Sequence, residues 1–324
     1  MRGTVVGVLR GGPSSEHDVS LKSGHAILKH LPEDRFTARD IYIDRAGVWH
    51  ERGIPTSPDK VLPGVDIVVI ALHGAYGEDG EVQKLLERFG VPYTGSDSFS
   101  SFVAMHKVMA KEKAKEVGLL TPKYRFIERL EDVDDTVHDV IRTFTQPVIV
   151  KPARGGSSVG TTMEAGYQPV HQAVTGLLKQ DEGGVLVEEV IRGTEATAGV
   201  VEGLRGEVLY QLPPIEIVPP EDSAFFTYDA KYSGATREIC PGRFNKQVSQ
   251  ELMDKARLMH DALGLRHYSR SDFIISPRGI YYLETNSLPD LIEDSGFSDA
   301  FKAVGVGYPE FLSHIIELAL QKKK

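Results

Sequence analysis

The chain has 324 residues, of which 41% are hydrophobic and 26% are charged, and it contains one cysteine, Cys240. This length suits two or three packed units, and one cysteine excludes both an intrachain disulfide and a cysteine-based zinc cluster. A formal net charge of −9 argues against a nucleic-acid-binding surface, and apolar runs such as residues 66–72 are far too short to span a membrane.

Strand-like and helix-like segments alternate through the first hundred residues, as is typical of an α/β protein. The chain enters its first strand without a charged and then apolar leader, so we expect a cytoplasmic protein that does not associate with membranes. Together these segments predict a parallel-sheet domain over residues 1–100. We expect strands at 4–9, 36–43 and 66–72, and helices at 17–31 and 82–89.

The alternation then restarts and predicts two further α+β subdomains, over residues 101–185 and 186–324. From residue 195 the strands are expected to be antiparallel and longer. Residues 213–244 are poorly patterned and too long for a plain connector, so we expect a functional loop there. The expected helices are 98–117, 133–144, 168–179, 247–263 and 308–320, and the expected strands before residue 195 are 124–128, 147–151 and 184–191.

The residues around Ser276-Pro-Arg-Gly279 are expected to form a β-hairpin. If Ser276 pairs with Ile280 around a three-residue loop, Gly279 occupies a position that favours a left-handed residue. This register places Asp272 directly opposite Glu284. Two carboxylates that face each other across a strand pair repel, and a divalent cation between them would reverse the sign of that interaction.

The same register places Arg270 opposite Asn286, and strand alternation puts all four side chains on one face. Asp, Glu and Asn supply the oxygen ligands that magnesium prefers in sites completed by substrate phosphates. We therefore interpret Asp272, Glu284 and Asn286 as a candidate metal site. The alternative is a solvated hairpin face with an Arg–Glu pair.

A glycine- and serine-rich loop is the candidate phosphate site. The chain has no Gly-x-x-x-x-Gly-Lys-Ser/Thr motif and no Gly-x-Gly-x-x-Gly after its first strand, which excludes a P-loop enzyme and weakens a dinucleotide fold. A strand instead delivers Lys151 to the loop 153–160, where backbone amides and a lysine charge could hold phosphate oxygens. A mobile surface loop is the alternative. Downstream, Glu195 follows a possible hinge and could hold ribose hydroxyls.

The order of these features resembles the ATP-grasp enzymes and, more narrowly, the D-alanine–D-alanine ligases. The similarity runs nearly end to end, through the motifs at residues 11–20, 71–80, 92–96 and 228–232. It implies an ATP-grasp fold and an enzyme of peptidoglycan precursor synthesis. ATP would phosphorylate the carboxylate of one D-alanine, and the amine of a second would attack the acyl phosphate. The resemblance also implies two magnesium or manganese ions and a homodimer formed through the N-terminal region.

The resemblance implies roles for individual residues. Metal ligation is implied for Asp272, Glu284 and Asn286. ATP binding is implied for Lys107, Lys151, Glu188, Glu189, Ile191, Glu195 and Lys231, although relatives often have lysine where Glu189 stands. Substrate binding is implied for Glu16, His73, Arg270 and Ser295. A catalytic network is implied for Glu16, Ser157, Tyr232, Arg270 and Ser295, with residues 225–233 as a lid.

One segment departs from the family pattern. Asp290 replaces a glycine and Ile292 replaces a threonine in the stretch that, with Arg270, holds the carboxylate of the second substrate in the family. An acid at position 290 would repel a carboxylate unless it turns away. Three functions therefore stay open: a D-alanine–D-alanine ligase, a paralogous ligase that joins an amino acid to another amine or hydroxy acid, and a catalytically idle ATP-binding module.

Overall fold

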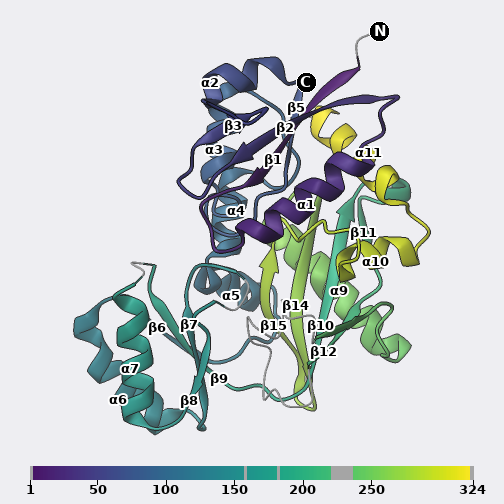
Figure 1. The fold of residues 1–324 in the computed structure, drawn as a ribbon. Coiled ribbons are helices and arrows are strands. Elements are labelled where there is room, and N and C mark those ends of the chain that lie inside the picture. Colours follow the sequence, from purple (N-terminus) through teal and green to yellow (C-terminus); the bar gives the residue numbers. More distant parts are fainter. Residues whose placement is uncertain (1–2, 157–158, 181–182, 220–235, 322–324) are drawn as a thin grey trace.

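The structure is a computed structural model that describes residues 3–156, 159–180, 183–219 and 236–321. Three β-sheets with helices packed against them make up the described chain (Figure 1). The mixed α/β architecture agrees with the expected fold class. None of the helices among the described residues has the length and apolar character that crossing a membrane requires.

The N-terminal sheet has the strand order β4-β3-β2-β1-β5. Its centre is parallel, as predicted, because β1 pairs in parallel with both β2 and β5. β3 and β4 extend one edge in antiparallel fashion and were not predicted. The strands are β1 (Thr4–Gly11), β2 (Phe36–Ile43), β3 (Trp49–Glu51), β4 (Ile54–Thr56) and β5 (Ile67–Ile70). The helices are α1 (His17–His30), α2 (Pro58–Val61), the short 3₁₀ turn η1 (Leu62–Gly64) and α3 (Glu81–Phe89).

The central sheet is antiparallel, with the order β6-β9-β7-β8, and two helices cover one face (Figure 1). A core made mainly of valines joins sheet and helices, because β-branched side chains pack well on a pleated surface. The strands are β6 (Tyr124–Ile127), β7 (Val148–Pro152), β8 (Thr162–Glu164) and β9 (Val185–Glu189). The helical segments are η2 (Leu130–Asp132), α6 (Val133–Thr143) and α7 (Tyr167–Leu178).

The C-terminal sheet has the order β13-β12-β10-β14-β15, with β11 paired to β10, and is antiparallel as predicted. Phe273 and Tyr282 pack with α4, α5 and α9, whereas Tyr268 packs with Phe297 and Phe311 in the core shared with the N-terminal sheet. The strands are β10 (Thr194–Glu202), β11 (Leu209–Gln211), β12 (Ile215–Val218), β13 (Arg237–Ile239), β14 (Tyr268–Ser276) and β15 (Gly279–Asn286). The helical segments are α4 (Ser98–Met105), α5 (Lys107–Glu116), η3 (Leu204–Gly206), α9 (Lys246–Ala262), α10 (Gly296–Ala303) and α11 (Tyr308–Gln321).

The helix predicted over residues 98–117 is two helices, and the prediction of one continuous helix is wrong. His106 adopts an extended backbone, with φ −84° and ψ 99°, between α4 and α5. The backbone N–H of Lys107 then donates to Ala153 O at 2.9 Å instead of continuing the helical ladder. The break brings the start of α5 to the glycine- and serine-rich loop.

The three proposed domains remain a prediction. By sheet membership, β9 belongs to the central sheet, because it pairs with β6 and β7. The predicted boundary after residue 185 therefore falls at the start of this strand. β12 and β13 lie inside the predicted functional loop at 213–244, and residues 220–235 of that loop lie outside the described chain.

Candidate active site

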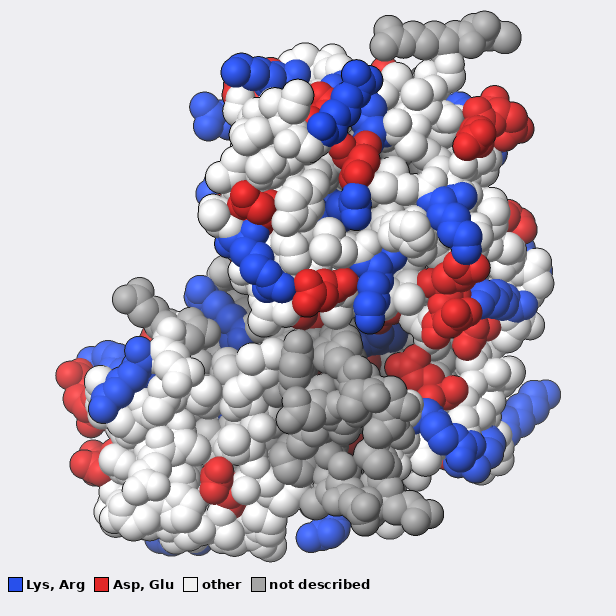
Figure 2. Space-filling view, in the orientation of Figure 1, with Lys and Arg blue, Asp and Glu red and all other residues white. Residues whose placement is uncertain are grey.

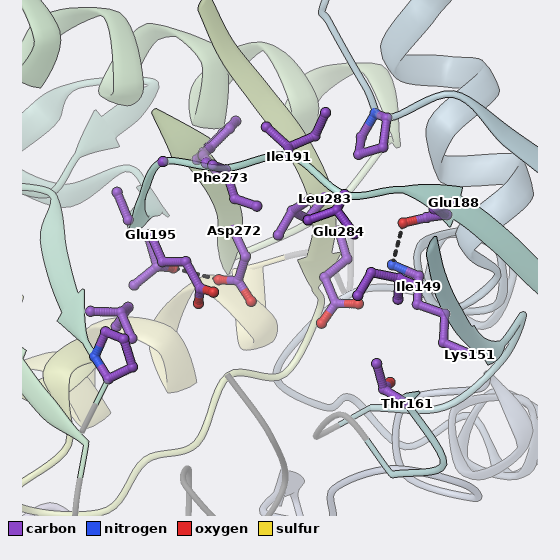
Figure 3. A pocket seen from close by; sticks show the side chains of 18 of the residues that line it. Ile149, Lys151, Thr161, Glu188, Ile191, Glu195, Asp272, Phe273, Leu283 and Glu284 are labelled. Carbon is purple, nitrogen blue, oxygen red and sulfur yellow. Dashed lines mark hydrogen bonds and ion pairs between the residues drawn. The ribbon is translucent and has the colours of Figure 1, made fainter. Parts of the chain in front are cut away.

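A cavity of about 540 Å³ lies where the central and C-terminal sheets converge (Figure 3). Its lining comes from both sheets and from the start of α5. Nine of the residues predicted from the sequence line it together: Lys107, Lys151, Glu188, Glu189, Ile191, Glu195, Arg270, Asp272 and Glu284. The remaining walls are largely apolar and suit a flat base, with Ile149, Met163, Phe273 and Leu283 among them.

The connection between β9 and β10 forms one wall of the cavity and contains Ile191 and Gly193. A Cβ atom on Gly193 would lie 2.1 Å from the carbonyl oxygen of Ile275. Only a glycine lets the connection pass this close to β14. The side chain of Glu189 accepts from Lys123 N at 3.0 Å and lies 3.7 Å from Nη1 of Arg278, which is in the turn between β14 and β15.

Glu188 joins two lysines at the closed end of the cavity. Lys151 Nζ lies 2.8 Å from Glu188 Oε2, and Lys111 Nζ lies 3.0 Å from Glu188 Oε1. Burial raises the pKa of Glu188, but the two ammonium groups lower it by more, so this carboxylate is ionised. Burial lowers the pKa of Lys111 to about 8, against the opposing effect of Glu188. Lys111 was not predicted from the sequence, although it lies one helical turn after Lys107.

Lys107 connects the glycine- and serine-rich loop that is the candidate phosphate site, called the phosphate loop below, to β15, which carries Glu284 and Asn286. Its Nζ lies 2.7 Å from Glu284 Oε2 and also donates to Gly155 O at 2.7 Å. A cation therefore already sits beside one of the two facing carboxylates. The positive charge of Lys107 offsets part of the repulsion between the carboxylates of Asp272 and Glu284.

The hairpin pairs Asp272 with Glu284 and Arg270 with Asn286, as predicted. The predicted three-residue loop is wrong, because Ser276 pairs with Gly279 across a two-residue turn. A β-bulge at Leu283 restores the predicted pairing. An extra residue at a bulge re-aims its neighbours, and both Leu283 and Glu284 line the cavity.

The donor set fits a magnesium ion that is completed by phosphate oxygens. Asp272 and Glu284 face each other, and Asn286 is two residues along the same strand. Asp272 Oδ1 is oriented by Thr197 Oγ1 at 2.6 Å and by Arg270 Nε at 3.2 Å. Within the described ranges, no group of three or more His, Cys, Asp or Glu residues could hold a metal alone. Two carboxylates and an amide suit an ion that shares its ligands with a nucleotide.

Glu16 lies at the junction between the N-terminal sheet and the phosphate loop. A Cβ on Gly74 would lie 2.6 Å from Glu16 Oε2, and one on Gly156 would lie 3.1 Å from it. Two loops therefore approach this buried carboxylate closely. A carboxylate here suits the ammonium group of an amino acid.

His73 and Glu78 border the same region. His73 Nε2 lies 2.9 Å from Ser23 Oγ, and its Nδ1 lies 3.2 Å from Leu288 O. Burial lowers the pKa of His73, so the ring is a neutral hydrogen-bonding partner. Glu78, which was not predicted, accepts from Gly74 N at 2.8 Å. Burial and then the carboxylate of Glu16 raise the pKa of Glu78 to about 8.

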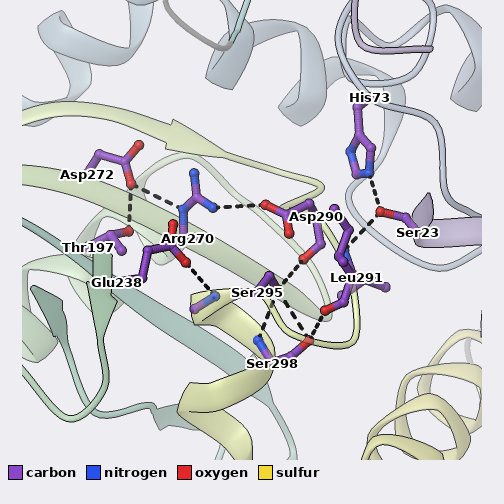
Figure 4. Close-up of polar contacts among 12 residues, drawn as sticks. Ser23, His73, Thr197, Glu238, Arg270, Asp272, Asp290, Leu291, Ser295 and Ser298 are labelled. Carbon is purple, nitrogen blue, oxygen red and sulfur yellow. Dashed lines mark hydrogen bonds and ion pairs between the residues drawn. The ribbon is translucent and has the colours of Figure 1, made fainter. Parts of the chain in front are cut away.

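Arg270 reaches the segment that departs from the family pattern (Figure 4). Its Nη1 lies 3.5 Å from Asp290 Oδ2, so Asp290 turns toward the guanidinium. Ser295 lies at the start of α10, where its Oγ accepts from Ser298 N at 3.3 Å. Glu238, which lies on β13 and was not predicted, accepts from Gly296 N at 2.6 Å.

Three predicted residues lie outside the described chain: Ser157, Lys231 and Tyr232. Their roles, and the lid predicted over residues 225–233, stay predictions. Two of the missed residues, Thr197 on β10 and Glu238 on β13, lie outside the motifs, and only their position in the folded chain brings them to the site. Glu78 lies within the motif at residues 71–80, but the motif alone assigned it no role.

Family models match most of the chain. The model described as D-ala D-ala ligase C-terminus matches residues 114–317, and the one described as D-ala D-ala ligase N-terminus matches residues 5–60 and 52–96. A D-alanine–D-alanine ligase of Syntrophobacter fumaroxidans is 38% identical over 98% of this chain and 97% of its own length. One of Carboxydothermus hydrogenoformans is 36% identical over 98% of this chain and 99% of its own length.

Solved structures show the same similarity. A D-alanine–D-alanine ligase from Bacillus anthracis superposes with a TM-score of 0.83 at 30% identity, covering 99% of this chain and 98% of its own. The same enzyme complexed with ATP has a TM-score of 0.81 at 28% identity, with the same coverage. The VanG D-Ala:D-Ser ligase from Enterococcus faecalis has a TM-score of 0.85 at 27% identity, covering 98% of this chain and 100% of its own.

Proposed function

This chain belongs to the D-alanine–D-alanine ligase family, and we propose that it uses ATP to join two D-alanines for peptidoglycan precursor synthesis. The observation that carries this proposal is the cavity of about 540 Å³. The cavity is lined by Lys107 and Lys151, by the β9–β10 connection and by the facing carboxylates Asp272 and Glu284. The two carboxylates are more than 100 residues away in sequence from the two lysines, yet all four side chains line one space.

The first step is phosphoryl transfer from ATP to a carboxylate oxygen of the first D-alanine, which releases ADP. Positioning and neutralisation of charge are most of what a protein supplies to such a transfer. We assign the phosphates to Lys107 and Lys151 and the base and ribose to Glu188, Ile191 and Glu195. Asp272, Glu284 and Asn286 would hold two magnesium or manganese ions, which neutralise phosphate charge when bound.

The second step is attack by the amine of the second substrate on the acyl carbon. A C–N bond forms, the bond from carbon to the phosphate oxygen breaks, and phosphate leaves with the electron pair while the amine loses a proton. We assign the first ammonium to Glu16, with His73 as a neutral neighbour. Arg270 would stabilise the negative charge that develops on the acyl oxygen, because a guanidinium donates in a fork.

A D-alanine-dependent assay of ADP release tests this proposal. With magnesium and ATP, the wild type should release ADP when D-alanine is present and not when L-alanine replaces it. No release with D-alanine alone, but release once another amine is added, would favour the paralogous ligase. No release with any acceptor would favour the idle ATP-binding module.

We also propose a homodimer formed through the N-terminal region and a cytoplasmic location. Lys, Arg, Asp and Glu are interspersed over the face shown in Figure 2, without a large field of one sign. Such a surface fits small-molecule substrates better than a nucleic acid. Light scattering of the purified chain at micromolar concentration would test the dimer, and a monomer mass would contradict it.

A further inference from the structure

The guanidinium of Arg270 is already partnered by carboxylates of this chain. Its Nε lies 3.2 Å from Asp272 Oδ1, and its Nη1 lies 3.5 Å from Asp290 Oδ2 (Figure 4). Two carboxylates thus contact one guanidinium, and an incoming carboxylate would compete with them for it.

A second donor next to Arg270 is occupied in the same way. Gly296 is the first residue of α10, and its N–H donates to Glu238 Oε2 at 2.6 Å (Figure 4). The first N–H groups of a helix have no partner within the helix and favour an anion. Position 296 also permits this approach, because a Cβ there would lie 2.4 Å from Glu238 Oε2. Glu238 therefore sits where a substrate carboxylate would receive the same hydrogen bond.

We propose that Glu238 and Asp290 are specificity-determining residues of the second-substrate subsite, and this inference rests on the proposed ligase function. Glu238 occupies the backbone donor of α10 and Asp290 occupies one arm of Arg270. A second D-alanine must displace Glu238 before its carboxylate can bind. The subsite accordingly favours D-alanine over an amine whose carboxyl group is uncharged, such as D-alaninamide, by less than a subsite without these two acids would.

The two acids differ in how they resist displacement. Glu238 is exposed within the cavity lining, so water screens its charge and its side chain can rotate away. Asp290 is half-buried and follows Pro289 in a loop, where Leu291 N donates to Ser23 Oγ at 3.3 Å. We therefore expect Glu238 to act as a competitor that yields to substrate. Asp290 acts as a fixed negative charge.

Steady-state kinetics with Glu238→Gln and Asp290→Asn test this inference. D-alanine is varied to resolve its first and second KM values, and D-alaninamide is then varied as the acceptor at saturating first D-alanine. Glu33→Gln is the matched control, because Glu33 is exposed in the connection between α1 and β2. Both site variants remove a charge and keep the shape of the side chain.

The expected result is a second KM for D-alanine that falls by about 5-fold or more in Glu238→Gln, with a smaller change in the first KM. The KM for D-alaninamide should change little, because it has no carboxylate for Glu238 to oppose. A purely structural role would shift both acceptors alike. A second KM for D-alanine that is unchanged or higher in Glu238→Gln would overturn the inference.

Failure of the proposed function would look different. In that case the wild type would release no ADP with D-alanine at any concentration, before any variant is compared. Asp290→Asn removes a partner of a buried guanidinium and could disturb folding, so Glu238→Gln decides the outcome. If urea unfolding shows that Asp290→Asn is folded, a lower second KM for D-alanine in this variant adds support to the inference.

Discussion

Lys107 Nζ lies 2.7 Å from Glu284 Oε2, and this contact joins the start of α5 to β15, the strand that carries the candidate metal ligands Glu284 and Asn286. Lys107 also donates to Gly155 O at 2.7 Å. One side chain therefore links the phosphate loop to β15. A nucleotide with a bound metal would give both Lys107 and Glu284 new partners of opposite charge at once.

Neutralising Glu284 should uncouple this arrangement. We expect Glu284→Gln to lower kcat for D-alanine-dependent ADP release by at least about 100-fold, because second-shell metal partners alone cost 10–100-fold. The magnesium concentration for half-maximal activity should also rise. A magnesium titration of ADP release measures both quantities, with Glu33→Gln as the control. A Glu284→Gln enzyme with the magnesium dependence of the wild type would remove Glu284 from the metal site.

The Lys111–Glu188 pair should show strong coupling in stability. Lys111→Met leaves a buried carboxylate with Lys151 as its remaining ammonium partner, and we expect the free energy of unfolding to fall by about 2 kcal/mol. The double variant Lys111→Met/Glu188→Gln should lose less than the sum of the two single losses. Urea unfolding of all four proteins gives the coupling. Strictly additive losses would show that the two side chains do not interact energetically.

Glu78 should make stability depend on pH. Its pKa rises from an ordinary value of 4.5 to about 8 in the folded protein. Between these pH values the folded state keeps the Glu78 carboxyl protonated, whereas the unfolded state ionises it. The contribution of Glu78 to the free energy of unfolding therefore has its full value below pH 4.5 and is lost as the pH rises toward 8. Relative to Glu78→Gln, the wild type should lose up to about 1.4 kcal/mol per pH unit in this window. Urea unfolding at pH 5, 6, 7 and 8 measures this difference, and parallel pH profiles for the two proteins would contradict it.

Two glycines should respond oppositely to alanine. At Gly193 the new methyl group would meet the Ile275 carbonyl at 2.1 Å, so we expect Gly193→Ala to destabilise the fold by about 1–3 kcal/mol. Gly176 lies inside α7 with no atom within 4 Å of the added Cβ. We expect Gly176→Ala to stabilise it by about 0.5–1 kcal/mol. Thermal unfolding distinguishes them. Equal destabilisation of both variants would contradict the account, because only Gly193 has a backbone atom in the way of the added methyl group.

The sequence predicted the hairpin pairing well because charge and alternation both constrain it. Asp272 and Glu284 face each other as expected, although the turn is one residue shorter and Leu283 bulges. A bulge inserts a residue without changing which side chains must share a face. Local patterning therefore could not distinguish the two routes to the same register.

Contacts between distant segments could not be predicted in this way. The side chains of Lys111 and Glu188 meet across 77 positions of sequence, and Glu238 meets the Gly296 amide through the packing of β13 beside α10. No repeat, spacing or motif in the sequence indicates either contact. The break at His106 was missed for a related reason, since its cause is the hydrogen bond from Lys107 to Ala153 in another segment.

Product stoichiometry tests the central claim most directly. The wild type, incubated with magnesium, ATP and D-alanine, should form one D-alanyl-D-alanine for each ADP, measured by mass spectrometry of the same reaction. Asp272→Asn should form neither product above background. ADP release by the wild type without an equal amount of dipeptide would contradict the ligase account, and so would an undiminished yield from Asp272→Asn.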